Sequence, residues 1–206
     1  MRRLFLLFAF FLAACDADSG DGVTVYTVEL QPLNGSSADG TAAIRVDGAG
    51  GVFSVDLEVT GLDDRSHPQF LFARVTEISE CPTAADDTNA DGFVDVVEGL
   101  PRYGGILLPL DNDLSSQEQN IARYPTGASY SYSTSARLSD VRGALERPDP
   151  DPDDSVVTLG EGGRISPTDY VVVVHGTSRP LPASVATLPG LDGQTTLPVA
   201  CGTVRV

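Results

Sequence analysis

The residues with the clearest chemistry lie in one stretch of the chain, from Asp87 to Glu98. This stretch matches the calcium-loop pattern D-x-[DN]-x-[DN]-G-x5-E position for position. In such a loop, side-chain oxygens surround a hard cation, Gly92 allows the sharp turn, and the last carboxylate binds through both of its oxygens. The sequence therefore predicts calcium as the cofactor; the alternative is a solvated acidic connection between strands. The predicted ligands are Asp87, Asn89, Asp91, the carbonyl of Phe93, Asp95 through a water molecule, and Glu98.

The residues on either side of this loop argue against a pair of EF-hand helices. Gly99 and Pro101 come directly after Glu98, and a proline inside a helix removes a hydrogen bond and clashes with the preceding turn. Upstream, Cys81 and Pro82 predict no entering helix. We therefore expect calcium to stabilise a long surface loop, with a dissociation constant of about 10⁻⁴ to 10⁻³ M, as in extracellular modules.

The first fifteen residues predict export and lipid attachment. Two arginines precede the apolar stretch Leu4–Leu12, which is too short to span a membrane as a mature helix. Leu12-Ala13-Ala14-Cys15 resembles the bacterial lipobox, so residues 1–14 would be a signal peptide, and Cys15 would carry acyl chains such as palmitate. Residues 15–22 would then be a tether to the membrane. An ordinary signal peptide that ends near a cysteine is the alternative.

This leader places the chain in the bacterial cell envelope, lipid-anchored to a membrane and facing the periplasm or the exterior. Asp16 resembles a signal for retention at the inner membrane, but the choice between inner and outer membrane stays open. The net charge is −16, and such a chain lacks the basic patch that nucleic acid requires. The expected partners are therefore the membrane, through the lipid anchor, and an unidentified protein or envelope component.

Two cysteines remain once Cys15 is assigned to the lipid anchor. Cys81 and Cys201 would meet an oxidising compartment, where one disulfide between them is the simplest interpretation. Such a bond would close a loop of about 120 residues. The alternative is two free thiols in a soft metal site, which only His67 and His175 could help to complete.

Hydrophobic alternation predicts strands through most of residues 23–206, which we expect to form a single domain. Only Ser139–Arg147 has a helical pattern, and Pro148–Asp154 is expected to be a solvated loop because its prolines remove backbone donors. The fold class is thus all-β, an antiparallel β-sandwich with long loops and at most one short helix. The predicted strands are Val23–Leu30, Thr41–Asp47, Val52–Leu62, Pro68–Ile78, Tyr103–Leu110, Ser129–Leu138, Tyr170–His175 and Thr195–Val206.

Several segments carry a family resemblance. Leu30–Phe72 contains the runs Gly-Thr-Ala-Ala-Ile-Arg-Val, Val-Asp-Leu-Glu-Val-Thr-Gly-Leu and His-Pro-Gln-Phe-Leu-Phe, and two late segments are Tyr170–Gly176 and Leu197–Gly202. Together they resemble the chordin-type (CHRD) domain of bacterial lipoproteins and, more distantly, the copper-zinc superoxide dismutase sandwich. The resemblance implies a Greek-key sandwich of the superoxide dismutase or immunoglobulin kind. It also supports a bond between Cys81 and Cys201, since the dismutase fold ties a loop to its last strand.

The chain departs from this family where a metal would bind. Relatives have a His-x-x-His-x-His cluster where this sequence has His67, Phe70 and Phe72. Phenyl rings cannot ligate a metal, and a redox copper needs several imidazoles. Copper and zinc are therefore not expected, and we expect the two phenyl rings to pack into the core or a surface patch.

Two functional classes remain. The first is a non-catalytic, lipid-anchored envelope protein whose calcium loop serves adhesion, assembly or envelope maintenance. The second is a metal-handling or residual redox protein that uses His67 and His175 with nearby carboxylates. The sequence predicts no catalytic residues, since it has no nucleophile elbow and no glycine-rich phosphate loop. Enzymatic activity is open, and the pattern favours a protein that is not an enzyme.

Overall fold

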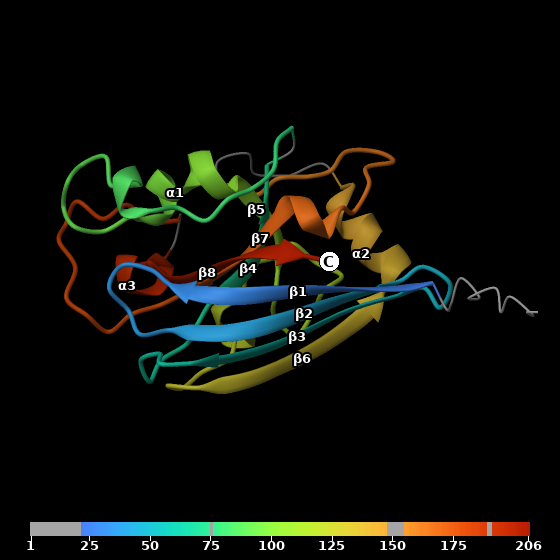
Figure 1. Cartoon of the computed structure of the whole chain (residues 1–206), viewed down its shortest axis with the longest axis horizontal. Coiled ribbons are helices and arrows are strands. Elements are labelled where there is room, and N and C mark those ends of the chain that lie inside the picture. The colour runs from blue at the N-terminus through green and yellow to red at the C-terminus, as the bar shows by residue number, and fades with distance from the viewer. Residues whose placement is uncertain (1–21, 75, 148–154, 189–190) are drawn as a thin grey trace, which may run out of the picture.

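One antiparallel sheet of eight strands curls over itself to form two layers (Figure 1). The computed structural model describes residues 22–74, 76–147, 155–188 and 191–206. The predicted signal peptide, Cys15 and the proline-rich loop 148–154 lie outside these residues. The prediction of an all-β, sandwich-like fold is confirmed. The strand order is β5-β4-β7-β8-β1-β2-β3-β6, with β1 Val23–Pro32, β2 Asp39–Asp47, β3 Val52–Thr60, β4 Gln69–Ala73, β5 Gly105–Pro109, β6 Tyr130–Arg137, β7 Tyr170–His175 and β8 Pro198–Arg205.

The described part of the chain also contains three short α-helices: α1 Val96–Tyr103, α2 Leu138–Leu145 and α3 Gly193–Thr196. The prediction of at most one helix was wrong. Helices α1 and α3 begin at aspartate caps, Asp95 and Asp192, whose carboxylates accept backbone N–H groups of the first turn. Helices this short leave too little periodicity in the sequence. None of the helices that the structure describes is long and apolar enough to cross a membrane.

Three predicted strands are shorter than expected by three residues or more, because a turn or a helix takes up one end of each. Strand β4 stops at Ala73, and the N–H of Arg74 then donates to the hydroxyl of Ser79, which turns the chain. Tyr103 belongs to α1 instead of β5, and Thr195 and Thr196 belong to α3 instead of β8. The sequence pattern located these strands and missed the helices next to them.

The layer of β1, β2, β3 and β6 follows the alternation of a half-buried sheet. In β3, Phe53, Val55, Leu57 and Val59 are buried, while the residues between them are polar and at least partly exposed. Burial of each such side chain stabilises the fold by about 1.5 to 3 kcal/mol. One face of this layer therefore makes the main core, and its other face meets solvent.

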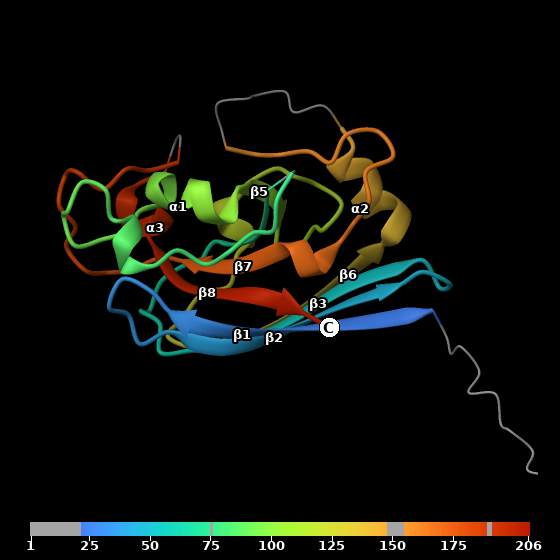
Figure 2. The same ribbon diagram turned by 45° about the horizontal axis from the view of Figure 1, so that its top comes forward.

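The other layer is buried on both of its faces. In β7, Val172 and Val174 belong to the main core, whereas Val171 and Val173 belong to a second apolar cluster on the opposite face. Figure 2 shows the resulting three levels, with β1 to β3 on one side of β7 and β8, and with α1 and α3 on the other. Because Val171–Val174 is continuously apolar, this layer needs a cover, and α1 and the long loops supply it.

A disulfide between Cys81 and Cys201 ties this cover to the sheet. Cys81 precedes the predicted calcium loop, and Cys201 lies on β8. The predicted disulfide is confirmed, and the alternative of two free thiols is wrong. The bond joins positions 120 residues apart, so it holds a distant loop against the strand that links the two layers.

We expect the Cys81→Ala/Cys201→Ala variant to lose up to about 4 to 5 kcal/mol of unfolding free energy, because a long closed loop restricts the unfolded chain. Urea unfolding of the oxidised protein and of the double variant measures this loss. Cys81→Ser/Cys201→Ser is the matched control for the choice of replacement. Equal unfolding midpoints for the wild type and both variants would contradict the assigned role.

Candidate calcium site

The predicted calcium loop lies in the cover over the second apolar cluster. It starts after the 3-10 turn η1, Ala84–Asp86, and runs into α1. Arg102 in α1 reaches back to this turn, with its Nε atom 2.9 Å from the carboxylate of Asp86 and its Nη1 atom 3.3 Å from that of Glu80. The two ends of the loop are thus linked by an ion pair as well as by the chain.

Side-chain oxygens inside the loop turn toward its own backbone. Asp87 accepts hydrogen bonds from the N–H groups of Asp91, at 3.2 Å, and Gly92, at 2.9 Å. Asn89 accepts from Asp91 N–H at 2.9 Å, and Asp91 accepts from Phe93 N–H at 3.0 Å. Gly92 has φ +91°, which glycine adopts without strain. The first three predicted ligands therefore wrap one tight turn.

Glu98, the last predicted ligand, folds back over the start of the loop. Its Oε1 atom accepts from Thr88 N–H at 2.8 Å, Thr88 Oγ1 at 2.7 Å and Asn89 N–H at 3.1 Å. Burial alone would raise the pKa of Glu98, but hydrogen bonds from Thr88, Asp95 and Asn89 outweigh it and lower the pKa below its ordinary value. The carboxylate is thus held in its charged form, which a cation requires.

The predicted absence of an exiting helix was wrong. Helix α1 starts at Val96, two residues before Glu98, and includes Pro101. Asp95 accepts hydrogen bonds from the N–H groups of Val97 and Glu98, and the Glu98 carboxylate accepts one from Asp95 N–H, which forms a capping box. An interior proline costs a helix about 3 kcal/mol. The cap contributes about 1 kcal/mol, and burial of Val96 and of Tyr103 at the helix end about 1.5 to 3 kcal/mol each.

The entering side of the loop agrees with the expectation. Only the 3-10 turn η1 precedes it, so within the described chain the loop has one α-helical flank and not the helix pair of an EF-hand. Movement of two helices against each other is therefore not available to this loop. An ion bound here would act on the order of the loop itself.

Asp95 was predicted to bind the ion through a water molecule, but in the structure its carboxylate accepts backbone hydrogen bonds. Its side chain is 1% exposed, and one oxygen caps α1 while the other accepts from Ala186 N–H at 2.6 Å. The hydroxyl of Ser184, in the same segment, donates to the carboxylate oxygen of Asp91 that does not bond to Phe93, also at 2.6 Å. In this structure Asp95 joins the loop to the chain segment 184–186, nearly a hundred residues further on.

Asn34 clamps the loop to the sandwich. Its Nδ2 atom donates to the carbonyls of Val94 and Pro198, both at 2.9 Å, and its Oδ1 atom accepts from Val94 N–H at 2.8 Å. It adopts φ +54°, which asparagine tolerates better than most residues. The analysis of the sequence missed this residue, because the Asn34-Gly35 pair signals only a turn.

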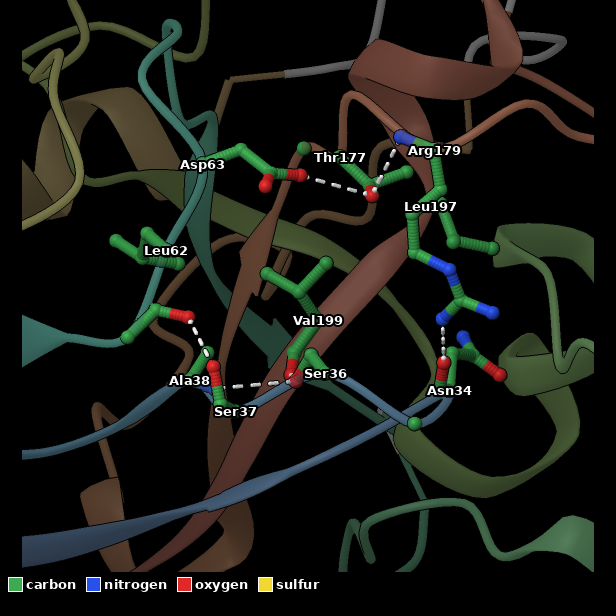
Figure 3. A pocket seen from close by; sticks show the side chains of 13 residues that line it. Asn34, Ser36, Ser37, Ala38, Leu62, Asp63, Thr177, Arg179, Leu197 and Val199 are labelled. Carbon is green, nitrogen blue, oxygen red and sulfur yellow. Dashed lines mark hydrogen bonds between the residues drawn. The ribbon is translucent and has the colours of Figure 1, made fainter.

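Arg179 completes the clamp on the other side. Its guanidinium lies 5.2 Å from the centroid of the Phe93 ring and donates to the carbonyl of Asn34 at 2.6 Å (Figure 3). The neighbouring pocket in Figure 3 also holds the contact between Thr177 and Asp63, at 3.0 Å. Hydrogen bonds from Ser178 N–H and from the Thr177 hydroxyl lower the pKa of the Asp63 carboxyl, although burial alone would raise it. Polar groups around this pocket therefore serve mainly to join the loops.

The two histidines are buried, and most of their ring nitrogens face backbone carbonyls. His67 places Nδ1 2.9 Å from the carbonyl of His175 and Nε2 2.8 Å from that of Asp63. His175 Nδ1 lies 3.2 Å from the carbonyl of Pro68, while its Nε2 atom has no partner among the described residues. Burial lowers the pKa of His175 to about 3, so this ring is neutral at physiological pH.

The phenyl rings of Phe70 and Phe72 pack against His175. Ring centroids of Phe70 and Phe72 lie 5.3 Å and 5.8 Å from that of His175, and Phe72 lies 4.4 Å from Tyr103 of α1. Both rings belong to the second apolar cluster. The expectation that they pack into the core is confirmed.

Within the described ranges, no three His, Cys, Asp or Glu side chains gather closely enough to hold a metal ion. The chemistry of the loop still fits calcium, since Asp87, Asn89, Asp91 and Glu98 offer only hard oxygen donors. Hydrogen bonds already draw all four toward the backbone of residues 88–93. Coordination would require Glu98 to exchange its bonds to Thr88 and Asn89 for the ion.

No family model matches this chain, and no curated protein matches it. The resemblance to the chordin-type domain therefore stays a prediction from the residues that carry it. The geometry of the loop and its clamps is the basis for a functional proposal.

We expect Asn34→Gly to lower the unfolding free energy by about 2 to 4 kcal/mol, because glycine keeps the backbone angle while three hydrogen bonds are lost at about 0.5 to 1.5 kcal/mol each. Asn112→Gly, the matched control, makes the same replacement at an exposed asparagine outside the clamp and should lose less. Urea unfolding of both variants measures the difference. If Asn34→Gly stays within experimental error of the wild type, Asn34 is not a clamp.

Proposed function

We propose that this protein is a non-catalytic, lipid-anchored module of the bacterial envelope, whose loop 87–98 binds calcium and thereby stabilises the cover of the sandwich. One observation carries the calcium assignment. The residues of the twelve-position calcium pattern form a single tight loop in which Asp87, Asn89, Asp91 and Glu98 turn their oxygens toward the same backbone segment.

Electrostatics support this assignment. Three carboxylates and one amide would meet the ion, and hard oxygen donors of this kind prefer calcium over softer metals. The chain as a whole carries a charge of −16, which raises the local concentration of divalent cations. The lowered pKa of Glu98 keeps its carboxylate ionised well below neutral pH.

The contacts of the loop support a stabilising role. Asn34 joins Val94 to β8 through Pro198, and Asp91 and Asp95 accept hydrogen bonds from Ser184 and Ala186. These partners come from three parts of the chain that are far apart in sequence. An ion that orders the loop would therefore hold all three parts in place at one end of the sandwich.

The anchor and the stabilised end together support a role outside the membrane. A domain that is tethered at its N-terminal side and held rigid by calcium suits adhesion, assembly or envelope maintenance. A metal-handling or redox role has weaker support, because His67 has both ring nitrogens on backbone carbonyls and His175 is surrounded by phenyl rings. We therefore propose only the first of the two classes.

We expect calcium at about 100 times its dissociation constant to raise the unfolding free energy by roughly 2.7 kcal/mol, because the ion binds the folded state alone. Thermal unfolding of the oxidised protein, in calcium-free buffer and in buffer with about 10 to 100 mM calcium, which is 100 times the expected dissociation constant, measures this effect. Magnesium should give little or no rise, since it demands a smaller and more regular oxygen shell.

Asp91→Ala should remove most of the calcium response. Asp64→Ala is the matched control, because it deletes an exposed carboxylate outside the loop and should leave the response intact. A calcium response that survives in Asp91→Ala would show that the ion binds elsewhere. Absence of any response in the wild type would contradict the calcium assignment itself.

We expect Cys15→Ser to release the protein from the membrane fraction, because the acyl chains that anchor it would be missing. Fractionation of expressing bacteria, followed by detection of the protein in membrane and soluble fractions, measures the change. Cys81→Ser/Cys201→Ser is the control, since these cysteines form the disulfide and should not affect anchoring. Equal membrane retention of the wild type and Cys15→Ser would contradict lipidation at this residue.

A further inference from the structure

The two edges of the sheet differ in whether another backbone segment hydrogen-bonds to them. At one edge, the segment 155–157 covers β5: Ile106 N–H donates to the carbonyl of Ser155 at 2.8 Å, and Val157 N–H donates to that of Ile106 at 2.9 Å. At the other edge, β6 pairs with β3 on its inner side. No other backbone segment among the described residues hydrogen-bonds to β6. Figure 1 shows β6 along the margin of its layer.

Strand β6 lacks the features that normally block pairing at a sheet edge. It pairs with β3 over eight consecutive positions without a bulge. Its run Tyr130–Ala136 contains no charged residue and no proline, and the next residue, Arg137, is its only charge. Natural edge strands are usually short, bulged or charged, because free N–H and C=O groups otherwise recruit another strand.

Two tyrosine side chains on the inner face of β6 hold the strand in place. Tyr130 donates its hydroxyl hydrogen to Gln69 at 2.7 Å, and Tyr132 donates to the carbonyl of Asp111 at 2.5 Å. The side chains that point outward are the exposed serines at positions 131, 133 and 135. The free edge is thus an ordered, extended backbone flanked by small hydroxyl side chains, and little entropy is lost when it pairs.

We propose that β6 is the interface between two copies of this chain, which pair antiparallel through their β6 strands around a two-fold axis at Ser133. Such an axis is perpendicular to the sheet, so residues that face outward in one copy meet residues that face outward in the other. Ser131 then lies opposite the partner's Ser135, and Ser133 lies opposite its own counterpart.

This register is self-complementary. On the inner face, Tyr130 lies opposite Ala136 of the partner subunit and Tyr132 lies opposite the partner's Thr134, so a large side chain always meets a smaller one. Every position of the uncharged run Tyr130–Ala136 has a counterpart within the same run. The pairing therefore brings no charge against another charge and uses the full length of the run.

The negative charge of the chain does not oppose this contact. The nearest acidic side chains on the outer face belong to Asp56 and Glu58 of β3, and Asp56 is paired with Arg45 and accepts a hydrogen bond from Ser133. The two β3 strands of a dimer would lie three strand spacings apart, about 14 Å. This distance exceeds the screening length of about 8 Å at physiological ionic strength. Repulsion between the copies is therefore weak.

The test is the oligomeric state of the full chain, purified in detergent in the form that its host produces. We expect the mass from sedimentation equilibrium to rise from one copy to two with protein concentration, since a single strand pair gives a small interface. In Ser131→Lys/Ser135→Lys the register places lysine opposite lysine twice, and the dimer should be lost. Thr27→Lys/Thr41→Lys, with the same added charge on exposed positions of central strands, should still form dimers.

A charge-swapped variant tests the register. Ser131→Lys/Ser135→Glu places each lysine opposite the partner's glutamate, so this variant should dimerise at least as well as the wild type. A wild type that stays monomeric at all concentrations, or a dimer that survives in Ser131→Lys/Ser135→Lys, would overturn the proposal. Loss of the dimer in the charge-swapped variant would overturn the register about Ser133.

A measurement on the wild type keeps the test independent of how the variants fold. Amide hydrogen exchange in β6 should slow as the protein concentration rises, while exchange in the central strand β2 should not change. Exchange in β6 that is independent of concentration in a sample shown to dimerise would also overturn the proposal. Neither result depends on calcium, so failure here is distinct from failure of the calcium assignment.

Discussion

Burial of the strand Tyr170–His175 on both faces is the constraint on which the rest of the structure depends. A half-buried sheet needs one partner layer, but the run Val171–Val174 is apolar on both sides and exposes neither. The other layer of the sandwich covers one face. Helix α1 and long loops cover the second face, and loops carry backbone polar groups that must be satisfied. The hydrogen bonds of Asn34 to Val94 and of Ala186 N–H to Asp95 satisfy such groups, and the disulfide at Cys81 fixes the cover to β8.

The candidate calcium loop is a part of the cover over the second apolar cluster. Helix α1 follows it directly and buries Val96 and Tyr103 against Phe72, so any change in the order of the loop reaches the second apolar cluster. The charged side chains of the loop would repel one another without a counterion, apart from their bonds to backbone N–H groups. An ion bound at this point would link the electrostatics of the loop to the packing of the cover, which is why we propose a stabilising role for it.

The same packing accounts for the departure from the resembled metal site. Phe70 and Phe72 contact each other and the neutral ring of His175, and Phe72 also contacts Tyr103 of α1. Imidazoles at these two positions would be polar groups without partners in an apolar cluster, which is costly. A cover made of α1 and loops thus favours phenyl rings, and the two features for which we propose functions lie on the surface of the sandwich: the loop at one end and the edge strand β6.

The sequence by itself determined the strands, the disulfide and the order of oxygen donors in the loop, because these depend on local alternation, on there being only two cysteines after Cys15, and on spacing within twelve residues. It could not determine helix α1, since Pro101 argues against a helix locally, and the burial of Val96 and Tyr103 together with the Asp95 cap outweighs it. Nor could it reveal the clamp by Asn34, whose partner Val94 lies 60 residues away. Tertiary structure alone also decided that segment 155–157 covers β5, while no backbone segment in the described part of the chain pairs with the outer edge of β6. Contacts between distant residues leave no periodic signal in the chain, because their energy appears only when folding brings the partners together.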